Sequence, residues 1–260
     1  MRAWWLLLLC WPALVRAEPT CEQAAPRGMA CIPAGSFVRG RDDGPVNEKP
    51  AAKVALSSYF MDLNEVTFVD YQACARAGKC TPAKPIYSDF NRPKQPMVLV
   101  TWFQAKAYCA AHGKHLPSEA EWEKAARGPD GELYPWGNEP VTCERAVIMD
   151  ARGRSCGLRK QGRPDLAEVG RTLEVPARPA YRYGLHDIIG NSWEWVADWY
   201  NGYPSGDQTD PLSKEQSQGR VFRGGCYGSV AADVRSADRN RFTPVIRGVL
   251  LGFRCAGGRR

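Results

Sequence analysis

The sequence predicts a loop-rich fold with short strands and helices, held together by disulfides. Glycine (25), proline (20) and tryptophan (9) are all abundant among the 260 residues, a mixture typical of loops held by aromatic packing and not of a helical bundle. Ten cysteines are present, which suits an exported chain with several disulfides. The length fits one large domain or two small ones, and the chain contains neither sustained heptads nor sequence repeats.

The N-terminus has the pattern of a signal peptide, residues 1–17. Arg2 precedes an apolar run, which ends in a small-x-small cleavage signal at Ala17. The run is far short of the roughly 20 residues that cross a bilayer, so cleavage is favoured over an uncleaved anchor. A lipoprotein anchored at Cys10 is disfavoured because leucine, not a small residue, precedes that cysteine. We therefore expect a secreted or periplasmic chain, residues 18–260, without a membrane span.

The charge of the chain is moderately basic and scattered. The formal net charge is +7, and removal of Arg2 and Arg16, two positive charges, with the signal leaves +5. Because lysine and arginine form no run, a solvated surface is favoured over nucleic-acid binding.

Nine cysteines remain once Cys10 is removed. They are Cys21, Cys31, Cys74, Cys80, Cys109, Cys143, Cys156, Cys226 and Cys255. Three pairs are close in sequence and would close short loops, a 15-residue loop being worth about 3 kcal/mol in the entropy model. These pairs are Cys21–Cys31, Cys74–Cys80 and Cys143–Cys156. Spacing alone leaves the connectivity open, and an odd number leaves at least one thiol free or paired with another chain. Zinc is disfavoured because no Cys-x-x-Cys occurs.

Strands and helices are predicted in chain order. Alternation within 32–37 and 54–60 indicates strands. Three helices are then marked by a hydroxyl N-cap, a polar residue three positions later and a glycine stop. The three sets are Thr67 with Asp70 and Gly78, Thr101 with Gln104 and Gly113, and Ser118 with Glu121 and Gly128.

Beyond Gly128 the periodicity fades. Residues 134–138 form an aromatic turn, and 143–182 show no clear element. Residues 187–199 hold three tryptophans, and 220–227 and 251–256 are predicted to be closing strands.

Seven motifs in order carry a resemblance to a known family. GKHLPSEAEWE at 113–123 resembles the GKRLPTEAEWE signature of formylglycine-generating enzymes. The others are IPAGSFVRG (32–40), NEVTFVDYQAC (64–74), YPWGN (134–138), GLHDIIGNSWEWVADW (184–199), RGG (223–225) and GFRCA (252–256). Together they cover nearly the whole mature chain, which is identified as a sulfatase-modifying-factor (FGE-sulfatase) domain over 18–260.

The resemblance implies a single α+β domain with little regular secondary structure, related to C-type lectins. It also implies a disulfide between Cys109 and Cys255. With the three local pairs, this disulfide would use eight cysteines and leave Cys226 alone.

The same resemblance places the chemistry just after Gly224 and Gly225. Family enzymes oxidise a sulfatase cysteine to formylglycine with copper and oxygen, and two cysteines hold the copper, since soft thiolates select Cu(I). Aligned on the two glycines without gaps, those positions are Ser229 and Val234. Neither side chain forms a thiolate, so copper and cysteine oxidation are not expected, and fold alone does not carry function.

Other residues remain pocket candidates. Cys226 stands where the family usually has a serine; a reactive thiol is one interpretation, but a buried inert residue or a partner in a rearranged disulfide is favoured. The further candidates are Ser229, Asp233, Arg235 and Arg239, with Arg241 beyond them.

The arginines resemble a stretch found in bacterial family members that also lack the cysteine pair. Arginine recognises carboxylates and phosphates in bidentate fashion, so a small anionic ligand is one hypothesis. The favoured alternative is internal salt bridges to Asp233, Asp238 or Glu194, because buried charges need partners.

Calcium is the metal that the resemblance implies. The transferred ligands are Asp187 and Glu194 through carboxylates and Gly190 and Ser192 through backbone carbonyls, an oxygen-only set that suits calcium. The alternative is an aromatic core turn in which Glu194 bonds backbone amides. A second family site near Val147 is not expected, because the asparagine it needs is missing.

Three functions compete. The favoured hypothesis is a secreted binding or accessory module, a pseudoenzyme with an unknown protein or small anionic ligand as partner. The second is divergent chemistry in the same pocket, as in relatives that act in siderophore maturation. Copper-dependent formylglycine generation is the least favoured. The iron-dependent sulfoxide-forming branch is excluded, because it needs a separate histidine-bearing domain.

Overall fold

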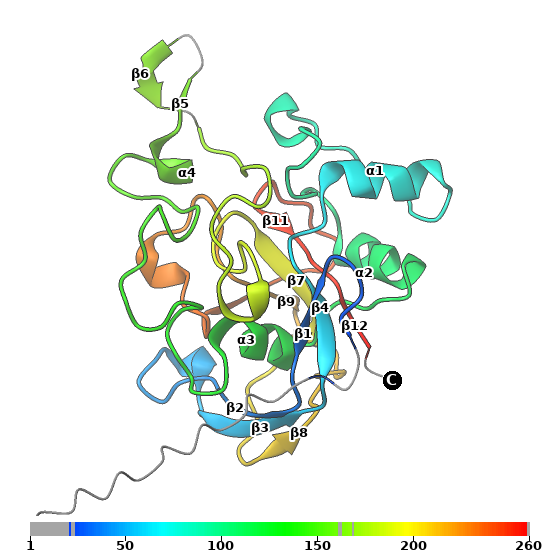
Figure 1. Ribbon diagram of the computed structural model, residues 1–260, viewed down its shortest axis with the longest axis vertical. Coiled ribbons are helices and arrows are strands. Elements are labelled where there is room, and N and C mark those ends of the chain that lie inside the picture. The colour runs from blue at the N-terminus through cyan, green and yellow to red at the C-terminus, as the bar shows by residue number, and fades with distance from the viewer. Residues whose placement is uncertain (1–20, 22–23, 161–162, 168, 259–260) are drawn as a thin grey trace, which may run out of the picture.

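A four-stranded sheet lies at the centre of the fold, with the strand order β10-β9-β7-β11. Its strands are β7 (Trp193–Trp199), β9 (Arg220–Arg223), β10 (Arg239–Phe242) and β11 (Leu251–Gly252). β9 pairs antiparallel with β7 and β10, and β11 pairs parallel with β7. The sheet therefore brings three family motifs, from 184–199, 223–225 and 252–256, side by side (Figure 1).

The computed structural model describes residues 21, 24–160, 163–167 and 169–258. The predicted signal peptide, 1–17, lies outside the described residues. Within the described part, no helix is long and apolar enough to cross a membrane.

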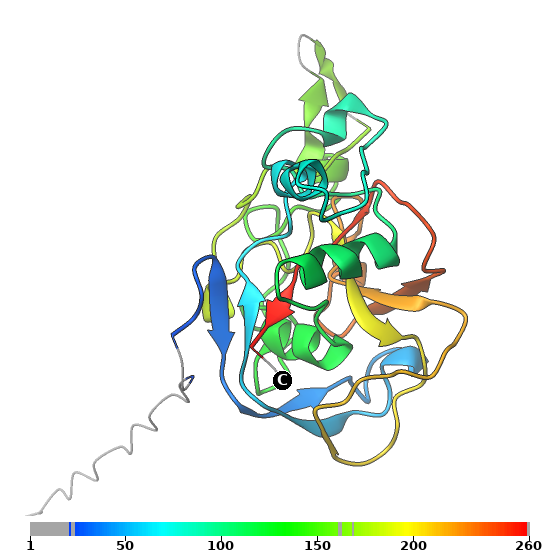
Figure 2. The same cartoon turned by 90° about the vertical axis from the view of Figure 1, so that its right-hand side faces the viewer.

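Two three-stranded sheets flank the central one, with the orders β1-β4-β12 and β2-β3-β8. Their strands are β1 (Met29–Ile32), β2 (Gly35–Arg39), β3 (Ala52–Leu56), β4 (Tyr59–Asp62), β8 (Gln208–Thr209) and β12 (Ala256–Gly257). Because β12 pairs with β4, the end of the described chain closes onto its beginning, as Figure 2 shows.

Three regular helices begin at the predicted N-caps. They are α1 (Phe68–Arg76), α2 (Trp102–Ala111) and α3 (Glu119–Arg127). Thr101 and Ser118 form complete capping boxes. At α1 the capping box is incomplete. Thr67 Oγ1 accepts a hydrogen bond from Asp70 N, but the Asp70 carboxylate accepts from the Thr67 hydroxyl instead of from the Thr67 backbone N–H.

The segment after α3 contains elements that the sequence pattern did not indicate. α4 (Arg154–Gly157) is a single turn in which Ser155 and Cys156 have left-handed φ of 52° and 59°. The strands β5 (Arg159–Lys160) and β6 (Arg163–Ala167) form a hairpin that projects from the body (Figure 1). Such short pieces carry no hydrophobic period, which explains the missed prediction. Four 3₁₀ turns complete the fold: η1 (Val46–Glu48), η2 (Ser88–Phe90), η3 (Arg182–Gly184) and η4 (Ala231–Asp233).

The two predicted closing strands are shorter than expected. β9 ends at Arg223 because Gly224 and Gly225 turn away with φ of 98° and 76°, values that glycine adopts without a Cβ penalty. The predicted strand 251–256 is divided into β11 and β12.

Four disulfides join the described chain. They are Cys21–Cys31, Cys74–Cys80, Cys109–Cys255 and Cys143–Cys156, and they leave Cys226 as the free cysteine among the described residues. The Cys109–Cys255 bridge lies in a core with Trp195 and Phe253, whereas Trp122 of α3 lies in a second core.

Candidate functional site

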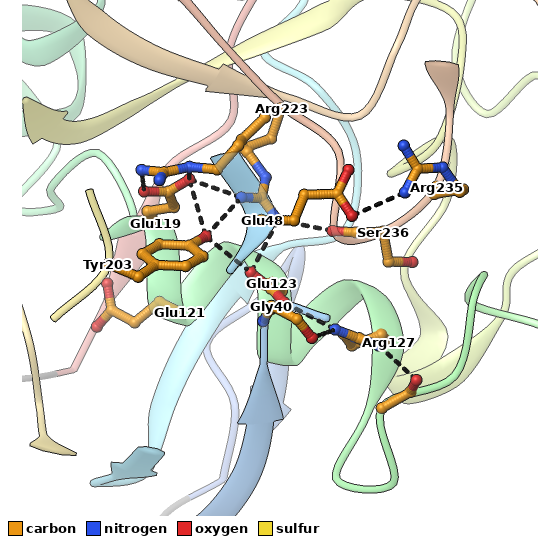
Figure 3. A network of polar contacts seen from close by, with 12 residues as sticks. Gly40, Glu48, Glu119, Glu121, Glu123, Arg127, Tyr203, Arg223, Arg235 and Ser236 are labelled. Atoms are coloured by element: carbon orange, nitrogen blue, oxygen red, sulfur yellow. Dashed lines mark hydrogen bonds and ion pairs between the residues drawn. The ribbon is translucent and has the colours of Figure 1, made fainter. Parts of the chain in front are cut away.

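Two buried glutamates on α3 hold two arginines from the central sheet. Arg223 Nη1 lies 2.6 Å from Glu119 Oε1, and its Nη2 lies 2.9 Å from Glu123 Oε2. Arg239 binds both oxygens of Glu119, at 2.8 and 2.6 Å. Figure 3 shows Arg223 reaching toward Glu119 and Glu123, with the Tyr203 hydroxyl beside them. Since Glu119 and Glu123 are four residues apart on one helix face, α3 presents both carboxylates to the sheet.

The charges in this network stabilise one another. Burial opposes ionisation of Glu119, but Arg239 and Arg223 outweigh it and lower the pKa of that carboxyl. For Glu123, burial is likewise outweighed by Arg223 and Arg127, so its pKa is also lowered. The network is therefore a buried ion cluster in which each glutamate pairs with two arginines, which explains how α3 is fastened to β9 and β10.

The pocket arginines are engaged within the protein. Arg239 places four hydrogen bonds, two on Glu119 and two on the carbonyls of Asn47 and Asn201. Arg235 pairs with Glu48 at 2.7 Å and, at 3.7 Å, with Asp238.

The internal acid partners of the arginines match the expected ones only in part. Of the three acids named from the sequence, Asp238 contacts Arg235, whereas Asp233 is exposed at the end of η4 and Glu194 pairs with Arg254. Arg241 is exposed and lies over the Tyr200 ring. The sequence pattern did not predict Glu48 as the partner of Arg235 or Glu119 as the partner of Arg239, because each pair is more than a hundred residues apart in the chain.

The turn that follows Gly225 contains the two aligned copper positions. Ser229 Oγ accepts a hydrogen bond from Cys226 N at 3.1 Å and lies 3.6 Å from Cys226 Sγ. Val234 is fully buried, and a Cβ on Gly225 would lie 2.3 Å from its Cγ1. Both positions therefore hold the turn together by a hydrogen bond and by packing.

Cys226 lies in the same turn as a buried thiol. Its sulfur accepts from Gly228 N at 3.4 Å. Burial raises the pKa of the thiol, and the hydrogen bonds from Ser229 and Gly228 offset only part of that effect. Low reactivity follows, since the thiolate is the nucleophile and metal ligand.

A neighbouring loop is bonded across this turn. Met149 N donates to Ser229 O at 2.9 Å, and Ser155 N donates to Tyr227 O at 2.8 Å. The Cys143–Cys156 disulfide staples that loop. The turn is therefore held at Tyr227 and Ser229 by backbone hydrogen bonds from this loop.

The four transferred calcium positions lie near one another but are not equivalent. Glu194 is saturated by donors, namely Arg254 at 2.7 and 2.9 Å and Trp122 Nε1 at 2.8 Å. These are side-chain donors, in contrast to the backbone amides of the alternative interpretation. Asp187 is buried; its Oδ2 accepts from Ala177 N at 2.7 Å, and its Oδ1 has no hydrogen-bond partner in the described chain.

Glu65 belongs to this cluster, although the sequence analysis did not single it out. Its Oε1 accepts from Asn191 Nδ2 and Ser192 Oγ at 3.2 and 3.3 Å, while its Oε2 has no partner among the described residues. Burial and then Asp187 raise its pKa well above the ordinary value. The sequence did offer one signal for Glu65: it is an acid inside the NEVTF motif, next to Val66, which is buried in the structure.

The copper of the family does not fit the 226–234 turn, and within the described residues no group of three or more His, Cys, Asp or Glu side chains is placed to hold a metal ion. Copper(I) needs soft ligands, and the aligned positions carry a hydroxyl and an isopropyl group. The orphaned carboxylate oxygens of Asp187 and Glu65 are the ligand type that calcium prefers.

The fold and site define a disulfide-stapled, single mixed α/β domain with a buried acid–arginine network beside a glycine-glycine turn. The chain belongs to the family with the sulfatase-modifying factor enzyme 1-like domain, which matches residues 15–258. The family membership and the α+β fold class predicted from the motifs are therefore confirmed.

Individual relatives agree with this assignment. The formylglycine-generating enzyme of Bos taurus is 31% identical, over 92% of this chain and 76% of that protein. The inactive C-alpha-formylglycine-generating enzyme 2 of Mus musculus is also 31% identical, over 88% of this chain and 85% of that protein. The structure of PvdO from Pseudomonas aeruginosa has a TM-score of 0.72 with 26% identity, over 88% of this chain and 93% of that one.

Proposed function

We propose that this chain is an exported, non-oxidising member of the family that acts as a binding or accessory module. The observation that carries the proposal is the turn at 226–234. Aligned on Gly224 and Gly225 without gaps, Ser229 and Val234 stand where the resemblance places the copper cysteines, and Cys226 is buried with a raised pKa. One protonated sulfur cannot replace two thiolates. The name of the mouse relative, inactive C-alpha-formylglycine-generating enzyme 2, supports the proposal of a non-oxidising member.

Disulfides support the exported location. Four bridges in one domain are typical of oxidising compartments such as the periplasm or the extracellular space. The predicted signal peptide, 1–17, points the same way.

Divergent chemistry in the same pocket is the second candidate and has less support. Its proposed groups are Cys226, Asp233 and the arginines. Asp233 is exposed, and Arg235 and Arg239 are paired with acids. For the same reason, an anionic ligand at these arginines would have to displace internal carboxylates. The partner of the proposed module, a protein or a small anion, therefore binds elsewhere.

We also propose a structural calcium ion at the 187–194 turn. Asp187 and Glu65 would supply carboxylate oxygens, and Gly190 and Ser192 would supply carbonyls. Calcium would compensate the two buried carboxyls, whose pKa values burial raises in its absence. Glu194 would not bind the ion directly, because both its oxygens already accept hydrogen bonds from Arg254 and Trp122. It would instead fix the position of the turn.

Copper affinity is the direct test of the non-oxidising assignment. The folded mature protein is titrated into a coloured Cu(I)–chelator complex under reducing, anaerobic conditions. We expect no withdrawal of copper, and the Cys226→Ser variant should behave identically. Withdrawal of one equivalent by the wild type, lost in Cys226→Ser, would overturn the proposal.

A further inference from the structure

A cavity of about 670 Å³ lies between α2, the start of β9 and the loop after β8, away from the 226–234 turn. Its lining combines apolar, cationic and acidic side chains, namely Trp102, Lys106, His115, Leu116, Glu121, Asp210, Leu212, Lys214 and Arg220. Neither the copper positions nor the calcium cluster contributes to it. The cavity is large enough for a small organic molecule.

Arg220 is the unusual member of this lining. Its guanidinium carbon lies 3.7 Å from the centre of the Trp102 ring and 3.8 Å from that of Trp199. Nη1 donates to Ala197 O at 2.6 Å, and Nε is buried without a hydrogen-bond partner in the described chain. Burial lowers the pKa of Arg220 to about 10, and Asp198 offsets only part of that effect.

The three cations of the cavity, Arg220, Lys106 and Lys214, form no direct ion pairs among the described residues. Lys106 and Lys214 are both exposed at the rim.

The two acids of the lining are committed to other partners. Asp210 accepts from the backbone and hydroxyl of Ser57 at 2.9 and 2.8 Å. Glu121 accepts from Ser118 N at 2.7 Å and lies 3.3 Å from His115. Because buried charge is costly without a partner, the partly buried Arg220 is suited to an external anion, with the exposed Lys106 and Lys214 adding positive charge beside it.

We propose that this cavity binds a small organic anion, a carboxylate or sulfate joined to a flat apolar body. Arg220, held between two indole rings, would meet the anionic group with its terminal Nη2, since Nη1 already donates to Ala197 O and Nε is buried; such charge-assisted hydrogen bonds are the strong ones. Lys106 and Lys214 attract the anion, and Leu116 and Leu212 contact the apolar part. The proposal is independent of the copper assignment, because the two sites share no residue.

The first test compares a matched pair of probes by isothermal titration calorimetry. Naphthalene-2-carboxylate and the neutral naphthalene-2-methanol have the same apolar body. We expect the carboxylate to bind at least about tenfold more tightly, because a charge-assisted hydrogen bond contributes roughly twice a neutral one. Equal affinity of the two probes, or no saturation by either up to about 10 mM, where binding falls below about 3 kcal/mol, would overturn the proposal.

Two variants then locate the site. Lys106→Gln with Lys214→Gln changes only exposed side chains, and we expect it to weaken carboxylate binding about threefold to tenfold. Lys79→Gln, an exposed lysine beyond α1, is the control and should bind like the wild type. Arg220→Lys keeps the charge but loses the stacking of the guanidinium between the two indole rings. We expect this variant to lose more affinity for the carboxylate than the lysine double variant does. If the double variant Lys106→Gln with Lys214→Gln and the Lys79→Gln control bind the carboxylate equally, the anion does not bind in this cavity.

Discussion

Ser229 Oγ accepts a hydrogen bond from Cys226 N across 3.1 Å, so the residue at the first copper position stabilises the turn that would have carried the metal. The 8% exposure of Ser229 and 2% of Cys226 make this bond a buried one. The start of the turn is therefore packed and held by a buried hydrogen bond.

Removal of the Ser229 hydroxyl should destabilise the protein. Ser229→Ala leaves the buried Cys226 N–H without its acceptor, and we expect a loss of about 1–3 kcal/mol in the free energy of unfolding. Urea unfolding followed by tryptophan fluorescence measures it. The exposed Ser205→Ala should change stability by less than about 0.5 kcal/mol, and an equal effect of both substitutions would contradict the structural role of Ser229.

The Cys226 thiol should be unreactive in the folded protein. Because burial raises its pKa, it stays protonated at pH 8. We expect a thiol-specific chromogenic reagent to label the native mature protein slowly, and to label one thiol per chain after denaturation without reductant. Rapid stoichiometric labelling of the native state would show instead that the thiol is accessible and ionised.

Asp198 should give the stability a pH dependence of defined sign. Burial, and then Glu119, raise its pKa from 3.8 to about 7. The folded state thus holds a proton that the unfolded state releases, and this contribution is present below pH 3.8 and lost as the pH rises to about 7. Asp198→Asn should show a shallower decline in guanidinium midpoint between pH 4 and 7. Identical slopes for the two proteins would refute the assignment.

Calcium should stabilise the fold through Asp187. Calcium at about 100 times its Kd adds roughly 2.7 kcal/mol, a rise in Tm of about 5–10 °C for a domain of this size. Chelator should reverse the shift, and Asp187→Asn should reduce it strongly. The exposed Asp207→Asn is the matched control. A calcium response retained in full by Asp187→Asn would place the ion elsewhere.

Local signals predicted the parts of the fold that depend on neighbouring residues. The caps at Thr67, Thr101 and Ser118 mark helix starts because each hydroxyl accepts from an amide three residues away. The motif order predicted the family and, through it, the fold class. These features need no knowledge of distant contacts.

Long-range pairing could not be predicted in the same way. The partners of Arg235 and Arg239 lie 187 and 120 positions away, and many acids are equally good candidates from sequence alone. The role of Glu65 depends on an approach of 126 positions to Asn191. The cavity at Arg220 likewise arises only when α2 and β9 meet.

The most direct test of the central claim is oxidation of a peptide that carries the sulfatase motif Cys-x-Pro-x-Arg. The folded mature protein is incubated with the peptide, Cu(I), reductant and oxygen, beside a copper-dependent formylglycine-generating enzyme as positive control, and the peptide mass is measured. The account predicts an unchanged cysteine in the sample and formylglycine in the control. Conversion of the cysteine by this chain would contradict the account, because it would show that a turn with Ser229 and Val234 still supports the copper reaction.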